Sequence, residues 1–173
     1  MKMQDQREIK AARPLVFAAI LDPDVLRDCI PGASSVSGNA QDGYEATVTQ
    51  KVGPVKATFH GTVQMSDMVE NEKITITGEG KGGAAGFAKG GAVVTLEALG
   101  PDMTRLSYDV EAKVGGKLAQ LGSRIIDGFA RKLADQFFAN LQAGLEGPPE
   151  APDEAAPEET AKKGWIKRMI GRG

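Results

Sequence analysis

The sequence predicts a single α+β domain in which a meander of antiparallel strands is covered by one long C-terminal helix. Between residues 43 and 114, apolar and polar side chains alternate at every second position, which is typical of strands with one covered and one wet face. From residue 117 to about 145, apolar side chains recur every three or four residues, which indicates an amphipathic helix. The inward face of the sheet is the only large apolar surface available to cover that helix.

The predicted meander has at least five strands joined by short turns such as Gly53-Pro54. The alternating runs cover residues 44–52, 55–65, 73–80, 92–98 and 105–114. A short polar strand is expected at about 3–10. Two short helices are expected to begin near Pro14 and near Asp22-Pro23, because proline is favoured at the first helical position and aspartate caps helices.

The inward face of the predicted sheet is rich in small side chains. Eight of its 24 positions are glycine or alanine: Ala46, Ala57, Gly61, Gly78, Gly80, Ala92, Ala98 and Ala112. A core packed to ordinary density favours larger residues at such positions. Two interpretations stay open from the residues alone: an apolar hollow between sheet and helix, or a helix that sits unusually close to the sheet.

Residues 82–91 contain five glycines around a single aromatic residue, Phe87. This composition predicts a mobile loop. Phe87 either caps the mouth of a pocket or packs on the surface.

No catalytic or metal-binding constellation is expected. Residues 78–83 match G-x-G-x-x-G, but a strand pattern follows where a dinucleotide site needs a helix. His60 is the sole histidine and falls on the wet face, and Cys29 is expected to be a buried structural thiol. The inward face offers only Gln50 and Tyr108 as polar groups, which disfavours an enzyme.

Composition also limits location and partners. The single cysteine favours a reducing, cytoplasmic compartment. The formal net charge of −2 argues against nucleic-acid binding. No apolar stretch is long enough for a signal peptide or a membrane-spanning helix, so membrane contact is expected to be peripheral.

Charge is segregated at the C-terminal end of the chain. Beyond a domain at 1–145, residues 146–161 carry six acids and no base, and their proline content predicts a disordered linker. Residues 162–173 carry five bases and no acid, and a helix would place their apolar side chains on one side. The composition predicts an amphipathic anchor for an anionic membrane leaflet, formed by Lys162, Lys163, Trp165, Ile166, Lys167, Arg168, Met169, Ile170 and Arg172. A docking peptide for a partner protein and an inert tail are the alternatives.

Several short motifs resemble the CoxG family of carbon monoxide dehydrogenase subunits, within the START/SRPBCC helix-grip superfamily. These are Leu21-Asp22-Pro23 with Ile30-Pro31-Gly32, Val52-Gly53-Pro54-Val55 with Phe59-His60-Gly61, Gly86-Phe87-Ala88 with Gly91, and the run Val114-Gly115-Gly116-Lys117-Leu118-Ala119-Gln120-Leu121-Gly122-Ser123-Arg124. The resemblance covers about residues 1–145. It implies a curved sheet of about seven antiparallel strands gripping the C-terminal helix around an apolar cavity.

The resemblance also implies a function. Members of the family look like quinone carriers that bring a molybdenum hydroxylase of the carbon monoxide dehydrogenase type to the inner face of the cytoplasmic membrane. We therefore expect a non-enzymatic protein with no covalent cofactor that binds an isoprenoid quinone, menaquinone or ubiquinone. A recruitment factor without ligand, and a small cyclase-like or hydrolase-like enzyme of the same superfamily, are the alternatives.

The expected ligand site combines the inward face of the sheet, the helix stripe and the glycine-rich loop. Phe87 is expected to gate its mouth, and Tyr108 to offer its hydroxyl to a quinone carbonyl. The expected lining residues are Phe59, Val63, Ile76, Phe87, Val94, Leu96, Tyr108, Leu121, Ile125, Phe129 and Leu133.

Overall fold

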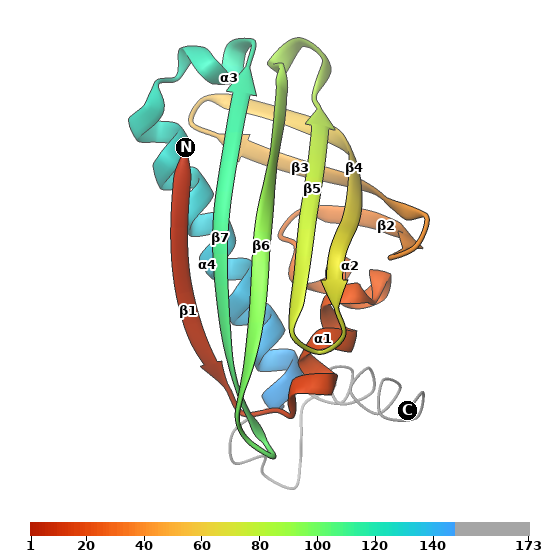
Figure 1. The fold of residues 1–173 in the computed structure, drawn as a ribbon. Coiled ribbons are helices and arrows are strands. Elements are labelled where there is room, and N and C mark those ends of the chain that lie inside the picture. The colour runs from red at the N-terminus through yellow and green to blue at the C-terminus, as the bar shows by residue number, and fades with distance from the viewer. Residues whose placement is uncertain (148–173) are drawn as a thin grey trace, which may run out of the picture.

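The computed structural model describes residues 1–147, which form one sheet with a long helix behind it (Figure 1). The strands are β1 (Lys2–Ile9), β2 (Ala33–Asn39), β3 (Gly43–Val52), β4 (Val55–Val69), β5 (Lys73–Lys81), β6 (Phe87–Gly100) and β7 (Met103–Gly115). All neighbouring strands pair antiparallel in the order β1-β7-β6-β5-β4-β3-β2. The expected helix-grip architecture with seven strands is therefore confirmed.

The helices are α1 (Arg13–Leu21), α2 (Pro23–Cys29), α3 (Lys117–Gln120) and α4 (Ser123–Glu146), with a short 3-10 turn η1 (Gly83–Ala85). α1 and α2 carry the chain from one edge strand, β1, to the other, β2. Both begin with a proline in the first turn, and the Asp22 carboxylate caps α2 by accepting from the backbone N–H of Asp24 at 2.9 Å.

Three local features differ from the sequence expectation. β2 has no counterpart among the predicted strands, because its Ser- and Gly-rich sequence lacks apolar alternation. β6 begins at Phe87, so much of the expected loop at 82–91 belongs to the sheet. The helix expected from residue 117 is interrupted at Gly122, whose φ of 90° lies in a region that other residues rarely adopt.

The packed core lies at one end of the molecule, where α1, α2 and the last turns of α4 meet the sheet. Its buried members include Ile9, Val16, Ile74, Leu106 and Leu141. The rings of Tyr108 on β7 and Phe138 on α4 stack with their centroids 4.3 Å apart. Cys29 is buried in the same cluster, as expected for a structural thiol.

Polar contacts fix α4 against the β1 edge of the sheet. The Arg7 guanidinium donates to the Gln142 side chain and to the backbone oxygen of Asp135, both at 3.3 Å. The Gln142 amide donates in turn to the backbone oxygen of Glu8 at 3.1 Å. These contacts hold the C-terminal half of α4 in place, beside the packed core.

Burial falls along α4 from its C-terminal half to its N-terminal half. Leu141 is 0% exposed, whereas Ile125 on the same apolar stripe is 42% exposed. Leu121 and Phe129, also near the N-terminal half, are half-buried. The sheet therefore covers only the C-terminal half of the stripe fully.

A buried tyrosine joins β3 to the end of α1. The Tyr44 hydroxyl donates to the backbone oxygen of Leu21 at 2.6 Å, and the residue is 2% exposed. Burial, with a smaller effect from the Asp22 carboxylate, raises the pKa of Tyr44 to about 12.

We expect Tyr44→Phe to lower the free energy of unfolding by about 1 kcal/mol at neutral pH, because the Leu21 carbonyl loses its donor. The folded-state pKa lies above the unfolded value of about 10, so the neutral phenol stabilises the fold fully below pH ~10. That stabilisation is lost as pH rises towards 12. Urea titrations across this range should show wild type losing stability faster than Tyr44→Phe; parallel losses would contradict the assignment.

The burial gradient along α4 predicts that shortening an apolar side chain costs more stability at the C-terminal half of the helix than at the N-terminal half. Leu141→Ala should lower the free energy of unfolding by about 2–5 kcal/mol, because it opens a cavity in the packed core. Ile125→Ala should lower it by less than about 1 kcal/mol, because the side chain is already largely solvated. Chemical denaturation of both variants measures the difference, and equal losses would show that the core extends along the whole helix.

Candidate functional site

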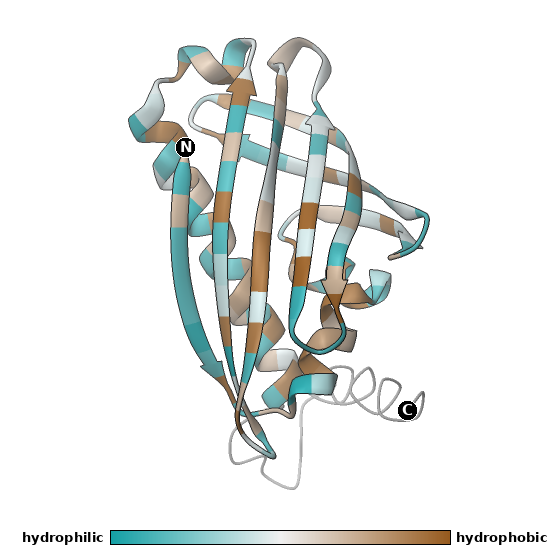
Figure 2. Ribbon diagram, in the orientation of Figure 1, coloured by the Kyte–Doolittle hydropathy of each residue, from teal (hydrophilic) through white to brown (hydrophobic). Residues whose placement is uncertain are grey.

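The strand register brings the small inward residues side by side. One cross-strand row contains Ala46, Gly61, Gly80 and Ala88, each directly paired with the next. The adjacent row contains Val63, Gly78, Gly90 and Ala112. Figure 2 shows the result along β5 and β6, where pale segments near the α3 end give way to strongly hydrophobic segments near the core.

The apolar side chains around these rows are only partly covered. Val55, Ala57, Phe59 and Val63 point inward on β4, an interior strand of the sheet, yet all four are half-buried. Inward residues nearer the core, such as Ile74 and Leu106, are 0% exposed. We call the partly covered surface the open apolar face; it comprises Val55, Ala57, Phe59, Val63, Leu121, Ile125 and Phe129.

The turn between β3 and β4 reaches over the start of α4. A Cβ placed on Gly53 would lie 3.8 Å from the Ile125 Cγ2 and 3.9 Å from a Leu121 methyl group. The open apolar face is thus bordered by this turn on one side and by α3 and η1 at the end of the sheet.

The eleven residues expected to line a ligand site fall in different places. Val94, Leu96 and Tyr108 are buried members of the packed core. Ile76 is half-buried and packs against that core, and Leu133 is half-buried on α4. Phe59 and Val63 point inward from β4, and Leu121, Ile125 and Phe129 lie at or near the N-terminal half of α4; we assign all five to the open apolar face.

Phe87 lies elsewhere. Val94 and Leu96 are buried, so the even-numbered residues of β6 point inward and the odd-numbered ones point outward. Phe87 therefore lies on the outer face with Lys89 and Val93. Its ring lies over Gly115, where any Cβ would collide with it, and 38% of the residue is exposed. The aromatic ring on the inner side of the loop is that of Phe59, since a Cβ on Gly82 would lie 2.5 Å from its Cε1. Sequence alternation places Phe59 inward but gives no sign of its contact with Gly82.

Tyr108 is not directed at the open apolar face. Its ring stacks on Phe138 in the core. Burial raises the pKa of the Tyr108 hydroxyl, and the carboxylates of Asp5 and Asp135 add to this rise. Asp5 is the register partner of Tyr108 on β1, and Asp135 lies on α4.

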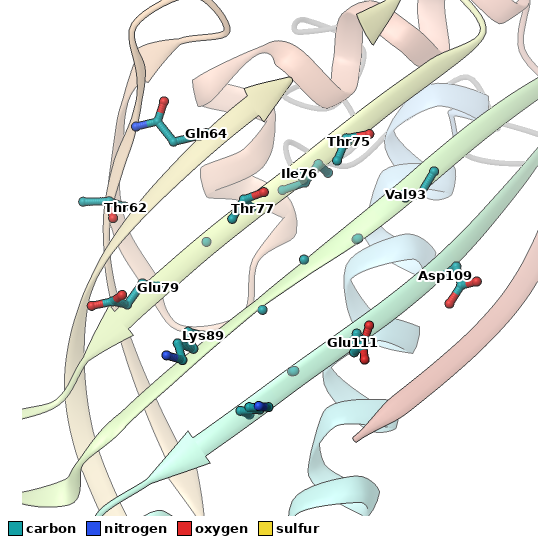
Figure 3. A pocket seen from close by; sticks show the side chains of 16 residues that line it. Thr62, Gln64, Thr75, Ile76, Thr77, Glu79, Lys89, Val93, Asp109 and Glu111 are labelled. Atoms are coloured by element: carbon teal, nitrogen blue, oxygen red, sulfur yellow. The ribbon is translucent and has the colours of Figure 1, made fainter. Parts of the chain in front are cut away.

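A separate hollow of about 790 Å³ lies on the outer face of the sheet, opposite α4 (Figure 3). Threonines and charged side chains surround it, among them Thr62, Thr77, Glu79, Lys89 and Glu111. It forms where Gly91 leaves the outer face without a side chain. Its mixed charges and its threonines do not suit an apolar ligand.

The described residues offer little for catalysis. Residues 1–147 contain no cluster of His, Cys, Asp or Glu side chains able to hold a metal ion. The Gln50 amide donates to the backbone oxygen of Pro31, so it serves the fold. His60 is exposed on the outer face, as expected. No helix within the same range is long and apolar enough to cross a membrane.

Comparison with known proteins is consistent with this geometry. The model of the carbon monoxide dehydrogenase CoxG family matches residues 6–146. A conserved protein from Geobacillus kaustophilus is similar in structure, with 28% identity, a TM-score of 0.77 and coverage of 84% of this chain and 95% of that one. No curated protein matches the chain.

Two further solved structures share the fold at lower identity. A START superfamily protein from Mycobacterium smegmatis is 16% identical, with a TM-score of 0.64 and coverage of 84% and 97% of the two chains. A protein from Chromobacterium violaceum is 21% identical, with a TM-score of 0.62 and coverage of 86% and 99%. The family match indicates an accessory protein. The chain belongs to the CoxG family of carbon monoxide dehydrogenase subunits.

Proposed function

We propose that this protein is a non-enzymatic accessory factor that carries an isoprenoid quinone, menaquinone or ubiquinone, on its open apolar face. In this proposal it serves a molybdenum-containing dehydrogenase of the carbon monoxide dehydrogenase type. It brings that enzyme to the inner face of the cytoplasmic membrane, where electrons pass to the quinone pool. The family name supports the partner, and the open apolar face supports the ligand.

The observation that carries the proposal is the set of half-buried apolar side chains of the open apolar face, around the glycine and alanine rows. Full burial of a Val, Leu, Ile or Phe side chain contributes about 1.5–3 kcal/mol. A ligand that covers five half-buried side chains therefore gains on the order of 5 kcal/mol from the protein side alone. An isoprenoid chain matches this surface, because it adds apolar area and needs no polar partner.

The chemistry of the face also argues for a carrier rather than a catalyst. The open apolar face as defined contains no ionisable side chain. General acid–base catalysis needs a positioned titratable group within hydrogen-bond reach of the substrate. Tyr108 and Gln50, the polar residues expected inward, are engaged in the core and with Pro31.

The membrane part of the proposal depends on residues 162–173, which lie outside the described residues. Their sequence combines five bases with Trp165, Ile166, Met169 and Ile170. Each base contributes about 1 kcal/mol of attraction near an anionic leaflet, so the segment suits weak, reversible attachment.

Filling the small-residue rows should displace the ligand. A Cβ on Gly80 would meet only the Phe59 Cβ, at 3.8 Å, so Gly80→Val fits the backbone and places its methyl groups over the open apolar face. We expect affinity for menaquinone-4 to fall at least about tenfold, with thermal stability unchanged or higher because valine favours strands. Thr77→Val, on the outer face of the same strand, is the matched control.

Titration with menaquinone-4, and mass spectrometry of lipids extracted from the purified protein, test this prediction. Wild type and Thr77→Val should bind equally. Absence of quinone in the extract together with no binding on titration would reject the carrier role and leave a recruitment factor without ligand.

Neutralising the tail should weaken membrane attachment. The change is Lys162→Gln, Lys163→Gln, Lys167→Gln, Arg168→Gln and Arg172→Gln together, and we refer to the product as the tail-neutral chain. Its affinity for vesicles of phosphatidylglycerol and phosphatidylcholine should be at least about tenfold lower than that of wild type. Vesicle flotation measures this. An unchanged affinity would show that these bases do not hold the protein on the leaflet.

A further inference from the structure

The α3 end of the sheet is basic. We use this name for the β3–β4 turn, the loop at 82–86, α3 and the first turn of α4, which lie together at one end of the molecule (Figure 1). The cationic side chains around it are Lys51, Lys56, Lys89, Lys113, Lys117 and Arg124, and all six are exposed. Each comes from a different helix or strand, so the fold rather than the local sequence gathers them.

Four of these lysines form two directly opposed pairs. Lys51 on β3 is the register partner of Lys56 on β4, and Lys89 on β6 is the partner of Lys113 on β7. Like charges opposite each other destabilise a sheet.

Lys51, Lys56 and Lys113 have no acidic residue opposite them in the strand register, whereas Lys89 lies opposite Glu79. None of them forms an ion pair with another residue in the range 1–147. Glu79, which lies opposite Lys89 on β5, pairs with Lys81 at 3.7 Å instead. An excess of positive charge without ion pairs fits an external anionic partner.

Apolar side chains stand among the cations. Ile125 and Phe87 are 42% and 38% exposed, and Pro54 at the β3–β4 turn is also exposed. Basic residues interleaved with exposed apolar side chains are the composition of surfaces that lie in the membrane interface. An acidic protein partner would account for the cations but would leave these side chains unexplained.

The opposite end of the molecule carries the reverse charge. The β4–β5 turn and the residues beside it present Asp67, Glu70 and Glu72, and the β6–β7 turn presents Asp102, all exposed. An anionic leaflet would repel this end and attract the other. The charge distribution therefore selects one orientation, with the α3 end towards the membrane.

We propose that the α3 end is itself a docking surface for an anionic bilayer, separate from the C-terminal tail. It rests this end of the molecule on the leaflet and brings Ile125, at the border of the open apolar face, next to the lipid, so that an apolar ligand passes between bilayer and protein by a short path. The position of the ligand in this scheme rests on the proposed function, but the docking surface stands on charge and exposure alone.

The test removes one lysine pair from the tail-neutral chain. In that background, residual binding to vesicles of phosphatidylglycerol and phosphatidylcholine should remain. Lys89→Gln with Lys113→Gln should then lower it about tenfold or more, since each cation near the leaflet contributes roughly fivefold in affinity. Lys10→Gln with Arg27→Gln removes the same charge from exposed positions at the opposite end and should leave binding unchanged.

A fluorescence probe tests contact with the bilayer directly. The chain has one tryptophan, Trp165, so Trp165→Phe with Phe87→Trp places a single reporter at the α3 end. Its emission should shift to shorter wavelength with phosphatidylglycerol vesicles and not with phosphatidylcholine vesicles. The same reporter at Thr95, exposed on β6 nearer the opposite end, should not shift.

Two results would overturn the proposal. One is equal vesicle binding by the Lys89/Lys113 variant and its Lys10/Arg27 control. The other is lysine-dependent binding to polyglutamate without binding to anionic vesicles, which would assign the surface to an acidic protein. Menaquinone-4 titration of the Lys89/Lys113 variant distinguishes failure of the docking proposal from failure of the proposed function. If the variant retains its affinity for menaquinone-4, the ligand-binding role holds even where membrane docking fails.

Discussion

The register between β4, β5 and β6 is the constraint on which the rest of the structure depends. It aligns glycines and alanines from neighbouring strands into continuous rows, so this part of the sheet presents few large inward side chains. Packing to ordinary interior density then becomes confined to the other half of the helix. One end of the molecule is a filled core, and the other is an apolar surface still in contact with water.

Stability and the proposed ligand site are thereby separated along one helix. The filled end contains the stacked Tyr108 and Phe138, the capped start of α2 and the buried Tyr44 hydroxyl. These contacts hold the fold without help from the open apolar face. The face can consequently remain uncovered without unfolding the domain, which is what reversible ligand exchange requires, since a carrier must be stable both loaded and empty.

Much of this architecture could be predicted from the sequence, because alternation and helical periodicity report which face of an element is covered. Periodicity does not show how far along that face other elements cover the apolar side chains. Val94, Leu96 and Tyr108 share the pattern of the open-face residues, and they belong to the core because α1 and the C-terminal half of α4 pack at their end of the sheet. The expected place of Phe87 is wrong for a related reason. A glycine-rich segment carries no apolar alternation, so the face on which Phe87 lies depends on its pairing with Lys81 and Gly115.

The direction of α4 has a mechanical consequence. Its 24 residues carry the chain about 36 Å away from the α3 end, at ~1.5 Å per residue, before the acidic segment begins. The fourteen residues at 148–161 can bridge at most roughly 50 Å even at full stretch. This reach exceeds the length of α4, so the last twelve residues and the α3 end can rest on the same leaflet at once. The length of the linker would then limit how far the domain can move from the membrane surface towards an enzyme.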